Sequence, residues 1–118
     1  MGRLRRVALW ACVIVLAAAF VLVGASKLRG PSAARWSERF AHWGFPTAAP
    51  YVVGALEVLG GLGLLIPRSR RAAAATLIFL MTGALLTHLL NGEAMRVIPP
   101  LVLGGLAFVV YRWRSPGP

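Results

Sequence analysis

The chain has 118 residues, of which 58% are hydrophobic and only 14% are charged. A soluble domain usually has about a quarter of its residues charged, so this composition argues against a soluble protein. Thirteen Lys and Arg residues stand against three acidic ones, giving a formal net charge of +10, and a single cysteine excludes an internal disulfide.

The first apolar run covers residues 7–25 and contains no charged residue. Its length falls within the roughly 17 to 25 residues that a helix needs to cross the bilayer core. A cleaved signal peptide is the alternative, because three arginines precede the run, but the run exceeds the usual apolar region of about 7 to 15 residues. We therefore expect a retained membrane helix, with Cys12 as a packing residue.

Residues 32–43 are predicted to form a short amphipathic helix between the first and second runs. Ser32 is its expected N-cap, and Gly44 with Pro46 is expected to end it. Such a helix suits the membrane interface, either as an aromatic anchor without chemistry or as a lid over a site between the spans. Its apolar face comprises Ala33, Trp36, Phe40 and Trp43, and its basic face comprises Arg35, Arg39 and His42.

Three further apolar runs cover residues 50–66, 72–90 and 97–111. The first of these is at the lower limit for spanning, and the last is expected to be a short or shifted span. The runs lack the alternation of barrel strands, so helices are preferred. The sequence therefore predicts an all-α membrane protein forming a single domain over residues 1–118, a bundle of four transmembrane helices with the interfacial helix between helices 1 and 2.

The basic residues lie between the runs and set the expected orientation. With four spans, eight of them fall on the side of both termini and five on the other, so the positive-inside rule places both termini in the cytoplasm of a plasma-membrane protein. The expected partner is the lipid bilayer, and nucleic acid is not expected because no basic helix stands apart from the membrane runs. The eight are Arg3, Arg5, Arg6, Arg68, Arg70, Arg71, Arg112 and Arg114.

Glu57 is the one acidic residue inside an apolar run, roughly 10 Å along its helix at 1.5 Å per residue. A carboxylate at that depth should face the bundle interior, be protonated or be paired. Gly54 and Gly61 share its helix face and would let another helix approach closely. Two interpretations remain open, a functional intramembrane acid and an interhelical latch without a substrate.

Three more polar residues are expected at a similar depth, near the outer leaflet. Lys27 follows the first run, His88 lies near the end of the third, and Asn91 begins the next loop. Lys27, Glu57, His88 and Asn91 are therefore candidate ligand-binding residues. Glu57 and His88 are the candidate catalytic pair, because a carboxyl beside an imidazole can deliver protons. No metal site is expected, since one cysteine and two histidines provide few ligands.

A series of short motifs along almost the whole chain resembles the DoxX and DoxX-like membrane proteins. Each motif alone is weak, and their order and spacing carry the resemblance. The motifs are GASKL (24–28), WGFP (43–46), VGALEVLGG (53–61), LLIPR (64–68), TGA (82–84), THLLNG (87–92) and PP (99–100).

The resemblance implies a four-helix membrane bundle whose recurring polar positions are Lys27, Glu57 and His88. Some relatives are subunits of a thiosulfate:quinone oxidoreductase, some belong to membrane complexes that resist oxidative stress, and distant ones act as assembly chaperones. This chain departs from the oxidoreductase subunits in lacking a second cysteine, which argues against independent sulfur chemistry.

We therefore expect a small subunit or accessory factor of a quinone-linked or oxidative-stress redox system, at most a non-autonomous oxidoreductase subunit. No intrinsic cofactor is expected, and a quinone is the candidate ligand. The expected protein partner is a membrane redox protein or a second copy of this chain. The alternatives are a small proton-coupled transporter and a non-catalytic membrane assembly or chaperone factor. Four-helix exporters carry their acid in the first helix, where this chain has none.

Overall fold

The computed structural model describes residues 2–113, and all regular secondary structure within that range is helical. Arg114, which belongs to the C-terminal group of the charge count, lies outside the described residues. The elements are α1 (Gly2–Ser26), α2 (Gly30–His42), α3 (Ala49–Leu64), α4 (Arg70–Leu90), the 3-10 turn η1 (Ala94–Val97) and α5 (Ile98–Arg112).

The helix ends agree with the sequence signals except at the start of α2. Pro50 lies in the first turn of α3, where a missing N–H donor is tolerated. Gly92 follows α4 with a φ of +71°, the left-handed conformation that often ends helices. The expected cap by Ser32 is wrong, because α2 already begins at Gly30 and the Ser32 hydroxyl donates to the carbonyl of Arg29.

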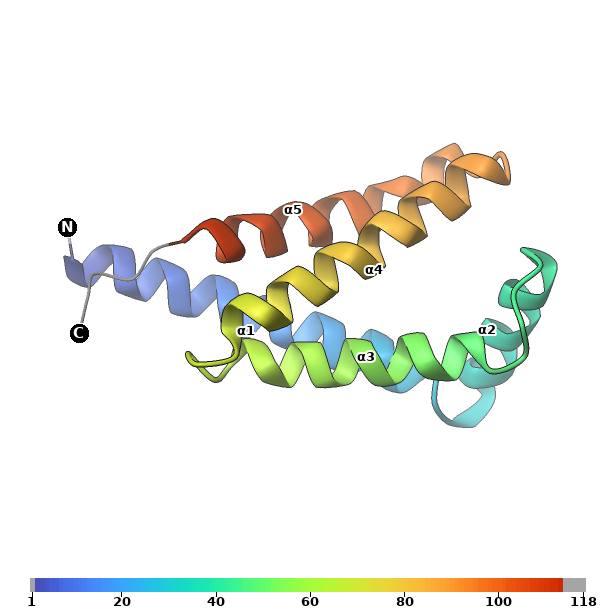
Figure 1. The fold of residues 1–118 in the computed structure, drawn as a ribbon, viewed down its shortest axis with the longest axis horizontal. Coiled ribbons are helices and arrows are strands. Elements are labelled where there is room, and N and C mark those ends of the chain that lie inside the picture. The colour runs from blue at the N-terminus through green and yellow to red at the C-terminus, as the bar shows by residue number, and fades with distance from the viewer. Residues whose placement is uncertain (1, 114–118) are drawn as a thin grey trace.

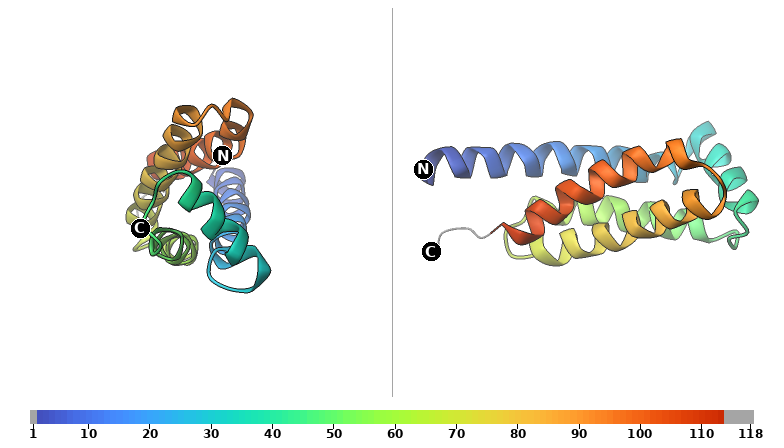
Figure 2. Two further views of the ribbon diagram at one scale, coloured as in Figure 1. Left: turned by 90° about the vertical axis from the view of Figure 1, so that its right-hand side faces the viewer. Right: turned by 90° about the horizontal axis from the view of Figure 1, so that it is seen from above.

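The long helices form two pairs that lie at an angle to each other. α1 runs beside α3, and α4 runs beside α5 (Figure 1). The start of α1, the α3–α4 connection and the end of α5 lie at one end of the molecule (Figure 2). α2 and the α4–η1 connection lie at the opposite end, towards which the two pairs diverge (Figure 1).

The hydrophobic core occupies the half of the bundle nearer the termini. Phe20 and Leu16 of α1, Leu64 of α3 and Leu77 of α4 are almost fully buried there. The partly buried Cys12 packs against this core, in agreement with the packing role expected for it. The core residues of α4 extend only to Met81, so the other half of the bundle is less tightly filled.

Three helical segments are long and apolar enough to cross a membrane, namely Gly2–Ser26, Arg70–Leu90 and the combined Ala94–Arg112. The last apolar run was expected to form a short or shifted span. It belongs to a longer segment, which reaches 19 residues because η1 precedes α5, so it is not short. α3 is the shorter apolar helix, with 16 residues. Large apolar side chains face outward, including Leu22 and Leu59, at 71% and 65% exposure. An outward apolar surface of this kind is what lipid requires and water disfavours.

Candidate functional site

A cavity of about 690 Å³ lies at the end where the helix pairs diverge. α2 and the segment after it provide four aromatic side chains to its wall, Trp36, Phe40, Trp43 and Phe45. The helices add apolar groups such as Leu103 and a few polar ones. Binding sites for small molecules are typically apolar cavities of about 300 to 1,000 Å³ with a few placed polar groups.

Two of the expected site residues form a buried ion pair on the wall of this cavity. The Lys27 Nζ donates to the Glu57 Oε1 at 2.7 Å. Lys27 is 4% exposed and Glu57 is 1% exposed, so neither charge is solvated by bulk water. A buried carboxylate needs such a partner, because an unpaired charge would be expelled from an apolar interior. Glu57 is therefore both a cavity residue and an interhelical link.

Close backbone contact between α1 and α3 brings this pair together. A Cβ atom at Gly24 would lie 2.6 Å from the Gly54 carbonyl oxygen, and one at Gly54 would lie 2.8 Å from the Gly24 carbonyl oxygen. Gly61 similarly faces α1, where an added Cβ would lie 3.0 Å from the Ala17 oxygen. The close approach predicted from Gly54 and Gly61 is thus confirmed, and Gly24 is its counterpart on α1.

Trp36 of α2, another residue of the cavity wall, packs its ring against Lys27. The Lys27 Nζ lies 4.1 Å from the centre of the Trp36 ring, within the range of a cation–π contact. The indole Nε1 donates to the Ser26 hydroxyl at 3.0 Å, which fixes the ring against the end of α1. α2 is therefore attached to the site through an aromatic ring.

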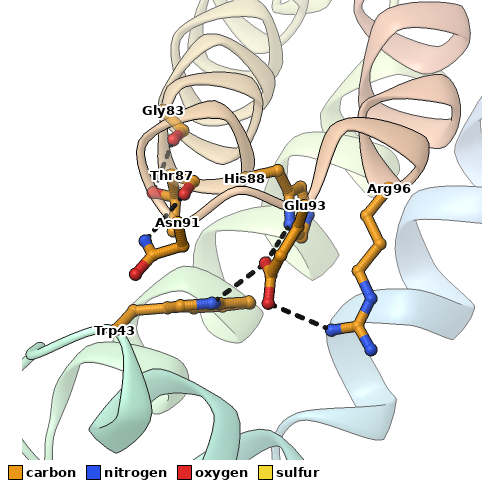
Figure 3. A network of polar contacts seen from close by, with 7 residues as sticks. All are labelled: Trp43, Gly83, Thr87, His88, Asn91, Glu93 and Arg96. Carbon is orange, nitrogen blue, oxygen red and sulfur yellow. Dashed lines mark hydrogen bonds and ion pairs between the residues drawn. The ribbon is translucent and has the colours of Figure 1, made fainter.

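His88 makes a different contact from the one that its depth suggested. Its Nδ1 lies 2.9 Å from Glu93 Oε1, which also accepts a hydrogen bond from Trp43 Nε1 at 3.1 Å (Figure 3). Arg96 Nη1 lies 3.5 Å from the other carboxylate oxygen. We call Glu93, His88, Trp43 and Arg96 the clasp, because they join the end of α2 to the α4–η1 connection.

The clasp changes the acidity of its central carboxyl. The hydrogen bond with His88, together with Arg96 and Trp43, holds the pKa of Glu93 below its ordinary value of 4.5. Each of these groups favours the ionised form over the neutral one. Glu93 is therefore ionised at neutral pH, accepting hydrogen bonds from His88 and Trp43 and forming an ion pair with Arg96.

The four expected ligand-binding residues have different positions in the structure. Lys27, Glu57 and His88 all line the cavity, but only Lys27 and Glu57 contact each other. Asn91 is exposed and is not among the lining residues, and its side-chain amide donates to the Thr87 carbonyl at the end of α4. Within residues 2–113, no three His, Cys, Asp or Glu side chains gather to hold a metal ion.

Glu93 and the two tryptophans of the site were not among the residues singled out from the sequence as a site. Trp36 and Trp43 were interpreted as one aromatic face, which is correct for their helix but does not reveal their different partners. Glu93 follows His88 by five residues across the Gly92 turn, a spacing that could have indicated their contact.

The arrangement can hold a flat amphiphilic molecule. Aromatic walls stack on a ring, while Lys27 offers N–H groups and His88 its second ring nitrogen, Nε2; the Thr87 hydroxyl already donates to the Gly83 carbonyl. Two carboxylates lie nearby, each already paired with a basic partner, so the site has groups suited to hold or pass a proton.

A bundle of apolar helices with outward-facing leucines and a buried ion pair defines a small α-helical membrane protein. The chain belongs to the DoxX-like family, whose model matches residues 7–110. This confirms the resemblance drawn from the sequence motifs. No curated protein and no solved structure matches the chain.

Proposed function

We propose that the whole chain is one plasma-membrane domain in which α1, α3, α4 and the combined η1–α5 segment all cross the bilayer, with both termini in the cytoplasm. α3 is about 24 Å long at 1.5 Å per residue, which suffices if the bilayer thins slightly beside it. Its position alongside α1 and its exposed Leu56, Leu59 and Leu62 support this topology. α2 would then lie at the outer interface, where its tryptophans are suited to the headgroup region.

Within this topology, the function that the geometry supports best is binding of a lipid-soluble molecule with a flat polar head, of the quinone class. The observation that carries the proposal is the cavity of about 690 Å³, walled by aromatic rings and bordered by Lys27, Glu57 and His88. The protein would act as a small subunit or accessory factor of a membrane redox system.

Named atoms of the cavity can meet the needs of a quinone. Lys27 donates one hydrogen bond to Glu57 and has two further N–H groups for a quinone carbonyl. His88 uses Nδ1 in the clasp, so Nε2 is its atom for a ligand. Reduction of a quinone to a quinol takes two electrons and two protons. The protons can pass through these groups, and we assign the electrons to a partner redox protein.

The position of two tryptophans provides a test by fluorescence. Trp36 and Trp43 line the cavity, whereas Trp10 contacts Arg70 and Trp113 contacts Arg5 at the other end of the bundle. Titration of a short-chain quinone into the purified protein should quench emission saturably. The W36F/W43F variant should lose the saturable part, and the matched W10F/W113F variant should keep it.

The same titration separates the proposal from its alternatives. Non-saturable quenching in all variants would reject a quinone site. Glu57→Gln should weaken binding roughly tenfold, equivalent to about 1.4 kcal/mol, if Glu57 orients Lys27 towards the ligand. In the native host the same variant should lower quinone-linked respiration by more than any loss in the amount of protein accounts for. Failure to accumulate, with no quinone binding by the native protein, would instead support the latch of an assembly factor.

A further inference from the structure

A second cavity, of about 790 Å³, lies at the opposite end of the bundle, near the start of α1 and the end of α5. Four arginines line it, Arg5, Arg70, Arg71 and Arg112, together with apolar groups such as Leu9 and Val110. The three acidic residues of the sequence are Glu38, Glu57 and Glu93, and none of them lines this cavity. Its wall is therefore strongly cationic and partly apolar.

Arg70, on the wall of this cavity, has one buried N–H group whose hydrogen-bonding capacity is unused. It is only 8% exposed, and its Nε donates to the Leu64 carbonyl oxygen at 2.8 Å. Its buried Nη2 has no hydrogen-bond partner among the described residues. An unpaired N–H of a buried guanidinium is costly, so the site is one that an acceptor would stabilise.

The N-terminus of α4 also favours a bound anion at this end of the bundle. Arg70 and Arg71 occupy the first turn of this helix, which contains no acidic residue and has no side-chain cap. The N-terminus of a helix carries a partial positive charge and free N–H groups, which favour anions and disfavour arginine. Two arginines at that position are therefore unfavourable unless an anion joins them.

Aromatic rings hold the arginines in place around the cavity. The guanidinium of Arg70 lies 4.6 Å from the centre of the Trp10 ring, and that of Arg71 lies 4.7 Å from the Tyr111 ring. Arg5 lies 5.4 Å from the Trp113 ring. Tryptophan and tyrosine beside arginine are typical of the headgroup level of a membrane.

We propose that this cavity binds the phosphate headgroup of an anionic phospholipid, with the acyl chains lying against the apolar side chains beside it. Guanidinium groups match phosphate oxygens in planar pairs, and basic pockets between membrane helices bind acidic lipid headgroups. A lipid is favoured over free phosphate because the cavity combines arginines with Leu9 and Val110. The site is independent of the ligand proposed for the other end.

Thermal unfolding of the purified full-length protein in detergent tests this assignment. Added dihexanoyl phosphatidylglycerol should raise the unfolding temperature saturably, whereas dihexanoyl phosphatidylcholine and inorganic phosphate should raise it far less. The R71Q/R112Q variant should need at least tenfold more phosphatidylglycerol for the same rise. Both residues are exposed, so this variant should fold.

The R3Q/R68Q variant is the matched control, because it removes the same charge at the same end from residues that do not line the cavity. It should keep its response to phosphatidylglycerol within twofold. Equal losses in the two variants would overturn the site in favour of general charge attraction. An equal effect of phosphatidylcholine would overturn the need for an anion, and an equal effect of inorganic phosphate would overturn the assignment to a lipid.

Discussion

The charge on Glu57 depends on one neighbour, the Lys27 ammonium 2.7 Å away. Both groups are almost fully buried, so the pair has already lost its hydration. The cost of that desolvation is comparable to the attraction gained, and the pair therefore adds less to stability than its short distance suggests. Its larger effect is to make either residue costly to remove alone.

Single substitutions of the pair should be more harmful than the double substitution. Glu57→Gln leaves the Lys27 charge buried without a counter-charge, and Lys27→Met does the same to Glu57. Each should lower the unfolding free energy by about 3 to 5 kcal/mol, as measured by chemical unfolding in detergent micelles. The Lys27→Met/Glu57→Leu variant should recover most of that loss. A double variant as unstable as the sum of the two single variants would show that the residues do not act as a pair.

Gly24 should tolerate no side chain. Gly24→Ala places a Cβ atom 2.6 Å from the Gly54 carbonyl oxygen, which forces α1 and α3 apart beside the ion pair. Overpacking of this kind costs about 1 to 3 kcal/mol, which thermal unfolding can measure. Gly105→Ala is the control, because an added Cβ there meets nothing within 4 Å. Equal stability of the two variants would contradict the close approach.

Part of the site could be predicted from single residues. Glu57 was conspicuous because lipid would exclude it, and Lys27 was expected at the same depth. Their contact was not predictable, because it depends on the relative rotation and shift of α1 and α3, which Gly24 and Gly54 set through backbone contact. His88 was expected near Glu57, but Glu93 offers it a nearer acceptor across the Gly92 turn.

At the scale of elements, α2 connects the two helix pairs. Trp36, in the middle of the helix, bonds to the end of α1, and Trp43, just after its C-terminal end, bonds to Glu93. The helix packs Phe40 inward and leaves Arg35 exposed, so its amphipathic pattern was a sound guide to its orientation. Which polar group each tryptophan reaches depends on the packing of distant helices, and the pattern could not indicate that.

Acid should loosen the attachment of α2. Because the pKa of Glu93 is lowered in the folded protein, its stabilising contribution is full above pH 4.5 and is lost as the pH falls through the lower folded value. Amide-exchange protection of residues 30–42, corrected for intrinsic rates, should therefore decrease below pH 4.5. Glu93→Gln should show reduced protection already at pH 7 and little further change in acid. Glu38→Gln, at an exposed position of α2, should behave like the native protein, and an equal effect of both substitutions would contradict the clasp.

The boundaries of the helices were predictable where proline or glycine marks them. The length of the last apolar segment was underestimated because its apolar run begins at Val97, whereas the helical segment begins at Ala94. The intervening turn contains Arg96, a residue that hydropathy counts against a span but that pairs with Glu93. The predicted segment was too short because composition does not reveal local ion pairs such as the one between Arg96 and Glu93.

At the scale of the whole molecule, the hydrophobic core lies in the half nearer the termini, and the two helix pairs diverge at the other end. Each end also has a large cavity, and the two are unlike, one aromatic with a buried ion pair and one lined by arginines. The helical class and the order of the elements follow from the apolar runs. The divergence of the two helix pairs cannot be predicted from these runs, because it depends on where small and large side chains of all four long helices meet.

The proposed placement of the two cavities in opposite leaflets depends on α3 crossing the membrane. If α3 crosses, its two ends must face opposite sides. In a Cys12→Ala background, Thr47→Cys places a thiol before α3 and Arg68→Cys places one after it, both at exposed positions. A membrane-impermeant maleimide added to intact cells should label the cysteine at position 47 and should reach position 68 only after permeabilisation. Labelling of both positions from the same side of the membrane would contradict the four-span topology and, with it, the placement of the two cavities in opposite leaflets.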